Sequence, residues 1–208
     1  IGFLSWVDTA PPMMPNNQLG QGEYTILEEL SYFYDFEFLD TDVESFENID
    51  LLFVYHPSDI TDKTEYAIEQ FILKGGKTVI FVDPFFEKND HSNKTSDLAN
   101  ILKTLNINYN SNIILDGAQA TRLQTQQNIS DNTSLQTILK LNWPEVRGQF
   151  INQSEEIGNG LSLIRLVSAG GLAPLNEDSQ ISYIPLISSS EVTMDLPMRE
   201  VHDPIKLI

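Results

Sequence analysis

Between Asp50 and Pro84 the chain passes from an unbroken apolar run, through an amphipathic stretch, to a second apolar run. The first run, residues 51–55, reads LLFVY and shows no alternation of apolar and polar positions. A strand without alternation has both faces covered, which is typical of a parallel sheet. The second run, residues 78–82, is likewise predicted to be buried, and Asp83-Pro84 follows it. We therefore predict strand, helix and strand in one right-handed crossover unit.

The amphipathic stretch, residues 62–73, has the spacing of a helix whose apolar face packs on the sheet. Thr61 or Asp62 can cap its first amides. Gly75-Gly76 follows its last turn, and we expect at least one of these glycines at positive φ, where it ends the helix. The predicted apolar face consists of Tyr66, Ala67, Ile68, Phe71 and Ile72.

The rest of the first half repeats this alternation. We predict strands over residues 1–7 and 34–39, and helices over residues 23–34 and 96–105. The expected core positions of these two helices are Ile26, Leu27, Leu30 and Phe33, then Leu98, Ile101, Leu102 and Leu105. Strands that alternate with helices predict an α/β fold: a parallel sheet with helices on both faces.

After Asn106 the pattern of apolar and polar residues changes. Short apolar segments, such as residues 113–115, 135–141 and 161–167, alternate with stretches rich in Asn, Gln and Ser. These segments predict a partly antiparallel, β-rich C-terminal portion. We interpret residues 124–134 as an exposed loop. Residues 1–106 are predicted to form the α/β core, and residues 107–208 a β-rich continuation of the same domain.

The composition argues against several classes of partner and site. A net charge of −18 argues against partners that are nucleic acids or anionic membrane surfaces. The absence of cysteine excludes thiol nucleophiles, disulfides and thiolate metal sites. No apolar run approaches the ~20 residues that span a bilayer. The chain begins at Ile1 inside a predicted strand, and we interpret it as a piece of a longer protein.

Candidate site residues follow the predicted parallel strands, because ligands of such sheets bind beyond the carboxyl ends of the strands. A histidine with carboxylates could serve proton transfer or a metal. The same residues fit turn formation, since proline follows both His56 and Asp83 and fixes the chain as it leaves the sheet. The candidate ligand-binding residues are Trp6, Asp8, His56, Asp59 and Asp83.

Standard catalytic and phosphate-binding motifs are missing from the sequence. It contains no G-x-S-x-G elbow, no G-x-x-x-x-G-K-[ST] loop and no H-E-x-x-H helix. No histidine or acidic residue follows His91 or His202 at i+3 or i+4. We therefore predict no catalytic residue, no metal site and no cofactor.

The stretch from His56 to Phe85 resembles a known family, the GldG-like auxiliary components of uncharacterised ABC-type transport systems, which are associated with gliding motility. The matching motifs are Y-A-I-E-Q-F at residues 66–71, G-G-K at 75–77 and V-D-P at 82–84. Ser96-Asp97-Leu98, and residues 185–187 followed by three serines at 188–190, fit the family pattern more loosely.

The resemblance implies a flavodoxin-like fold, with strand order 2-1-3-4, akin to class I glutamine amidotransferase domains. It implies a non-enzymatic accessory domain that works beside an ABC permease and ATPase. The expected location is periplasmic or otherwise extracytoplasmic, anchored to the inner membrane through segments outside this chain. The nucleophilic cysteine of the amidotransferases cannot be present. An alternative is a hydrolase- or amidotransferase-like enzyme that uses His56 with Asp8, Asp59 or Asp83.

Overall fold

A computed structural model of the protein describes residues 1–6, 25–84, 96–129, 132–177, 180–197 and 200. Its contacts divide the chain into two compact units, which are described separately. The first unit consists of residues 1–82 and 96–101, and the second of residues 83–95 and 102–208. The grouping of both halves into one domain stays a prediction.

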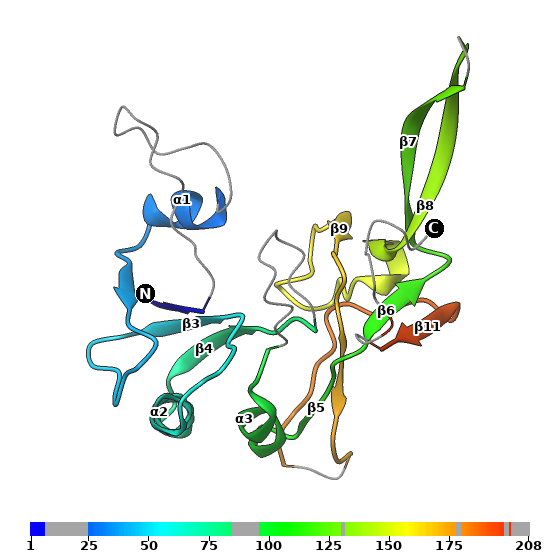
Figure 1. Ribbon diagram of the computed structural model, residues 1–208. Coiled ribbons are helices and arrows are strands. Elements are labelled where there is room, and N and C mark those ends of the chain that lie inside the picture. Colours follow the sequence, from blue (N-terminus) through cyan, green and yellow to red (C-terminus); the bar gives the residue numbers. More distant parts are fainter. Residues whose placement is uncertain (7–24, 85–95, 130–131, 178–179, 198–199, 201–208) are drawn as a thin grey trace, which may run out of the picture. The chain divides into compact units, whose positions relative to one another are not determined.

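The first unit is built on a four-stranded sheet in the order β2-β1-β3-β4 (Figure 1). Every neighbouring pair is parallel, so the predicted parallel sheet and its strand order are confirmed. The flavodoxin-like fold as a whole stays a prediction. The strands are β1 (Gly2–Ser5), β2 (Glu37–Leu39), β3 (Leu51–Tyr55) and β4 (Lys77–Phe81).

The two middle strands carry the core of this unit. Leu4, Leu52 and Val54 have no exposed surface, which agrees with the unbroken apolar runs. The prediction of a second fully buried run at β4 is wrong. All side chains of β4 are half-buried or exposed, and Phe81 is 38% exposed. The reason is its position, because β4 lies at the end of the described sheet and pairs there with β3 alone.

The crossover helix α2 (Asp62–Leu73) begins and ends as predicted. Thr61 is extended, and its hydroxyl oxygen accepts a hydrogen bond from the amide of Thr64 at 3.3 Å. Gly75 lies at φ +89°, a left-handed conformation that a side chain disfavours. Its N–H donates to the carbonyl of Ile72 at 2.9 Å, which closes the last turn.

The other helices are shorter than predicted: α1 spans Thr25–Ser31 and α3 spans Ala99–Thr104. Phe33, expected on the core face of the first helix, lies beyond its end and is 78% exposed. Tyr66, expected on the core face of α2, is 60% exposed. Helices on both faces of the sheet stay a prediction. No helix in the described part of the chain is both long enough and apolar enough to cross a membrane.

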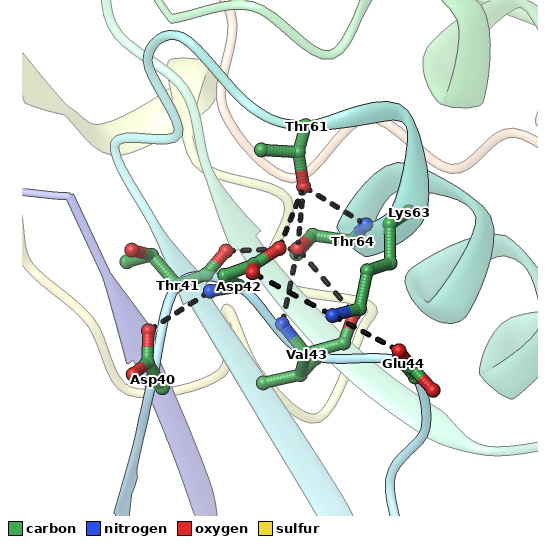
Figure 2. A network of polar contacts seen from close by, with 8 residues as sticks. All are labelled: Asp40, Thr41, Asp42, Val43, Glu44, Thr61, Lys63 and Thr64. Carbon is green, nitrogen blue, oxygen red and sulfur yellow. Dashed lines mark hydrogen bonds and ion pairs between the residues drawn. The ribbon is translucent and has the colours of Figure 1, made fainter.

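A polar network fastens the acidic segment after β2 to the start of α2 (Figure 2). The fully buried Thr64 hydroxyl donates to the carbonyl of Thr41 at 2.8 Å and accepts from the amide of Val43 at 3.2 Å. At the surface, the Lys63 ammonium lies 3.5 Å from Asp42 and 3.1 Å from Glu44. The hydrogen bond to Glu44 is the main cause that raises the pKa of Lys63.

The second unit contains antiparallel sheets, as predicted for the C-terminal portion. Strand β5 pairs with β10, β6 pairs with β11, and β8 pairs with both β7 and β9. A 3-10 helix, η1 (Gly148–Phe150), follows β8. The strands are β5 (Ile107–Asn110), β6 (Ile113–Asp116), β7 (Ala120–Ile129), β8 (Asn132–Arg147), β9 (Leu163–Arg165), β10 (Gly171–Pro174) and β11 (Thr193–Leu196).

The prediction of an exposed loop over residues 124–134 is wrong. Strand β7 runs to Ile129 and β8 starts at Asn132, so the described residues of this range belong to a long hairpin. The polar side chains of this segment show no apolar alternation, so the sequence did not indicate a strand. The order of the backbone comes from pairing between the two strands. Strand β8 also spans 16 residues, where the sequence predicted only a short strand.

Candidate functional site

The predicted edge site begins where the middle strands of the first unit end. The amide of Trp6, just after β1, donates to the carbonyl of Tyr55 at 3.3 Å. The amide of His56, just after β3, donates to the carbonyl of Phe81 at 3.0 Å. Because the strands are parallel, Trp6 and His56 lie at the same edge of the sheet.

The side chain of His56 is buried in the first unit, with 1% of its surface exposed. Its ring nitrogen Nδ1 lies 3.1 Å from the hydroxyl oxygen of Ser96, which is also buried. The next amide, that of Asp97, donates to the carbonyl of Pro57 at 2.6 Å. His56 also has φ +44°, a left-handed conformation that is uncommon outside glycine. These contacts fix the loop after β3 against residues 96–97.

The histidine and serine satisfy only part of what a hydrolase needs. Their separation is within hydrogen-bond reach, as for a nucleophile and its base. A catalytic pair must also meet its substrate in a concave, accessible site. Burial of both side chains denies that access, so the geometry favours a structural role for His56.

Of the three carboxylates of the predicted edge site, one lies in the first unit, one belongs to the second, and one lies outside the described residues. Asp59 is exposed and lies at φ +52° in the loop before α2. Asp83 is half-buried and belongs to the second unit. There, burial raises the pKa of Tyr109 well above its usual value, and the charge of Asp83 adds to this effect. Asp8 lies outside the described residues. Among those residues, no group of three or more histidine and acidic side chains is arranged to hold a metal ion.

A pocket of about 590 Å³ lies in the second unit, where the sequence had predicted no site. This volume is within the usual range for small-molecule sites. Two backbone hydrogen bonds hold its walls: Ile114 N–H to Ala169 O at 3.0 Å and Leu166 N–H to Pro144 O at 3.1 Å. The lining is mainly apolar and includes Ile114, Val146, Leu166, Leu172, Ile184 and Leu186. We call this feature the apolar pocket.

Asp116 is the polar centre of the apolar pocket and is fully buried. Its carboxylate accepts hydrogen bonds from the amides of Ala118, Gln119 and Ser190, at 2.8–3.0 Å. The Gln119 side-chain amide and the Ser190 hydroxyl donate to it at 2.9 and 2.7 Å. Burial by itself raises the pKa of Asp116, but the hydrogen bonds outweigh it and the pKa is lowered.

Gln119 also lines the apolar pocket, and its carbonyl oxygen Oε1 is buried without a hydrogen-bond partner. A buried acceptor left without a donor costs about 1–3 kcal/mol. The side-chain amide of the same residue is held by Asp116, so its orientation is fixed.

The sequence did not predict the contact between His56 and Ser96 or the apolar pocket. The contact of His56 with Ser96 joins residues 40 positions apart, and no motif marks it. The apolar pocket is assembled from four separate segments of the second unit. Residues 185–190, which fit the family pattern, supply part of its wall and the Ser190 groups that bind Asp116. The resemblance thus pointed to these residues without indicating a role.

Comparison with known proteins gives one clear result. A family model described as ABC-type uncharacterized transport system matches residues 1–204, almost the whole chain. No curated protein and no solved structure matches the chain significantly. The chain therefore belongs to this family of auxiliary components of ABC-type transport systems.

Proposed function

We propose that the protein is a non-enzymatic accessory component that works by binding, beside the permease and ATPase of an ABC-type transport system. The observation that carries this proposal is the family match over residues 1–204. The burial of His56 supports it, because the histidine that the enzyme alternative requires does not reach solvent. The apolar pocket supports a binding role, since it offers apolar walls and few polar groups.

The finer parts of the proposal come from the resemblance. We place the protein with the GldG-like components associated with gliding motility, outside the cytoplasm, held at the inner membrane by segments beyond this chain. We assign the first unit a flavodoxin-like fold, supported by its strand order 2-1-3-4. A reporter enzyme that is active only outside the cytoplasm, fused after residue 208 of the parent protein, tests the location. Activity supports it, and inactivity of a stably expressed fusion contradicts it.

The enzyme alternative has one observation in its favour, the separation of 3.1 Å between His56 and Ser96. The test is to change His56 or Asp83 to alanine in the full-length parent, and to follow transport-linked function, folding and assembly with the permease. Loss of function with normal folding and assembly would favour catalysis. Loss through misfolding or failed assembly supports the accessory role. His56→Asn is the matched control, because an amide retains hydrogen bonding to Ser96 without acid–base chemistry.

A further inference from the structure

Four large aromatic side chains lie on the surface of the first unit within seven residues of sequence. Their exposed fractions are 71% for Tyr32, 78% for Phe33, 55% for Tyr34 and 66% for Phe38. Single exposed apolar residues are ordinary, but grouped ones mark interaction sites. Tyrosine and phenylalanine are also enriched at protein interfaces. We call these four residues the aromatic surface.

The aromatic surface is carried by the connection from α1 to β2, at one side of the parallel sheet (Figure 1). The amides of Phe33 and Tyr34 both donate to the carbonyl of Leu30 at 3.0 Å, which ends α1 in a tight turn. Phe38 lies in β2, and its ring meets the buried Phe3 ring edge-on at 5.7 Å between centroids. The start and end of this surface are therefore held by the backbone and by the core.

The segment that leaves β2 is also fixed, by the network around Thr64 (Figure 2). Strand β2 has a neighbour on one side only within the described sheet. A rigid element that presents exposed rings loses little conformational entropy when a partner binds. The aromatic surface thus has the properties of a prepared docking site.

The charges around the aromatic surface determine what can bind there. Residues 1–62 contain no lysine or arginine. Between residues 31 and 50 every acidic side chain is exposed: Asp35, Glu37, Asp40, Asp42, Glu44, Glu47 and Asp50. The first cation of the chain, Lys63, lies near Asp42 and Glu44. Asp35 and Glu37 alternate with the aromatic residues themselves, so a negative field surrounds the rings.

We propose that the aromatic surface docks a protein partner whose binding face combines an apolar groove with lysine or arginine at its rim. Rings desolvated in a groove supply the binding energy, and the opposite charges guide the encounter and fix the orientation. An anionic membrane is disfavoured because the acidic rim would repel it. A second copy of this chain would oppose the same negative charges across a symmetric contact. The proposal does not depend on the role in transport.

The test uses three fluorescent helical peptides of about 18 residues, or five turns, as probes of partner chemistry. The first has a leucine face and a lysine face, the second replaces leucine by serine, and the third replaces lysine by glutamate. Anisotropy titration of the whole chain should show binding of the leucine–lysine peptide. We expect binding at least about tenfold weaker for the serine–lysine peptide, and none for the leucine–glutamate peptide.

Variants locate the contact. Tyr32→Ser with Phe33→Ser removes two of the exposed rings, and should weaken binding of the leucine–lysine peptide about tenfold or more. The matched control is Leu135→Ser in the second unit, a residue that is 69% exposed. Asp35→Asn with Glu37→Gln should weaken binding at low salt and reduce its salt dependence. Thermal melts that match the parent chain establish that each variant is folded.

Several results would overturn the proposal. Undiminished binding to the aromatic variant would mean that the peptide senses only the overall charge. Equal loss of binding in the Leu135 control would mean that any exposed apolar side chain serves equally well. Ring-dependent binding to vesicles of zwitterionic or anionic lipid, in place of the peptide, would assign the surface to a membrane. Sedimentation that shows self-association lost on removal of Tyr32 and Phe33 would assign it to a second copy.

Discussion

Replacing Thr64 by valine removes one hydroxyl from the network that holds the segment after β2. The side chain has no exposed surface, and its shape is almost unchanged by the substitution. The carbonyl of Thr41 loses a donor at 2.8 Å, and the amide of Val43 loses an acceptor at 3.2 Å. The hydroxyl of Thr61 also loses an acceptor at 3.0 Å. The N-cap of α2 survives, because Thr61 accepts from the backbone amide of residue 64.

The expected cost of Thr64→Val follows mainly from the two lost contacts to backbone groups, those of Thr41 and Val43. Each backbone group left without its partner costs about 1 kcal/mol where water reaches it, and up to about 3 kcal/mol where it does not. Both groups lie in a partly buried region, so we expect the free energy of unfolding to fall by about 2 kcal/mol. The ion pairs of Lys63 remain, but exposed pairs of this kind stabilise little.

Urea unfolding, together with hydrogen exchange at the Val43 amide, measures this effect both globally and locally. Thr64→Ser is the control, since it keeps the hydroxyl and loses one buried methyl group, at about 1 kcal/mol. The valine variant should release the Val43 amide to fast exchange, while the serine variant should keep it protected. Equal protection of that amide in both variants would show that the hydroxyl does not hold the segment.

Three further predictions concern other parts of the chain. Gly75→Val should lower the free energy of unfolding by about 1–2 kcal/mol through its positive φ alone, since an added Cβ meets nothing within 4 Å; Gly75→Asn should cost less in the same melts. Asp116→Asn should destabilise by about 2 kcal/mol at neutral pH. Because the pKa of Asp116 is lowered in the folded protein, its stabilisation is complete above the unfolded pKa and is lost as pH falls through the folded pKa, so urea melts of variant and parent should converge in acid. Ile114→Trp should fill the apolar pocket and abolish binding of the neutral dye N-phenyl-1-naphthylamine, with Leu135→Trp as the unaffected control; undiminished dye binding would exclude the pocket as the site.

The first unit could be predicted from sequence because its signals are local. The unbroken apolar run of β3 takes five residues, and the cap, helix and glycine of α2 lie within one continuous segment from Thr61 to Gly75. The β7–β8 hairpin escaped prediction, because its segments rich in Gln, Asn and Thr show no apolar alternation. Its order comes from the ladder between the two strands, which no single segment reveals.

The site was less predictable than the fold. Topology alone brought Trp6 and His56 to one edge, because parallel strands end there together. The sequence could not reveal that Ser96 meets the imidazole, or that Asp116 gathers hydrogen bonds from residues on both sides of a gap of more than seventy positions. Contacts of that range depend on the packing of distant segments. Phe33 illustrates the opposite error, since a correct helical spacing continued beyond the point where the helix ends.

The division of the chain bears on how the protein is made. After Val82 the polypeptide enters the second unit and returns to the first unit for residues 96–101. From residue 102 onward it belongs to the second unit. Leu98 and Ile101, which it contributes on that return, are 1% and 2% exposed. On the ribosome, the interior of the first unit stays incomplete until these residues have emerged, when residues 83–95 of the second unit already exist. The first unit therefore completes its fold only after synthesis of the second unit has begun. A chain released at residue 82 would lack two residues of the interior of the first unit.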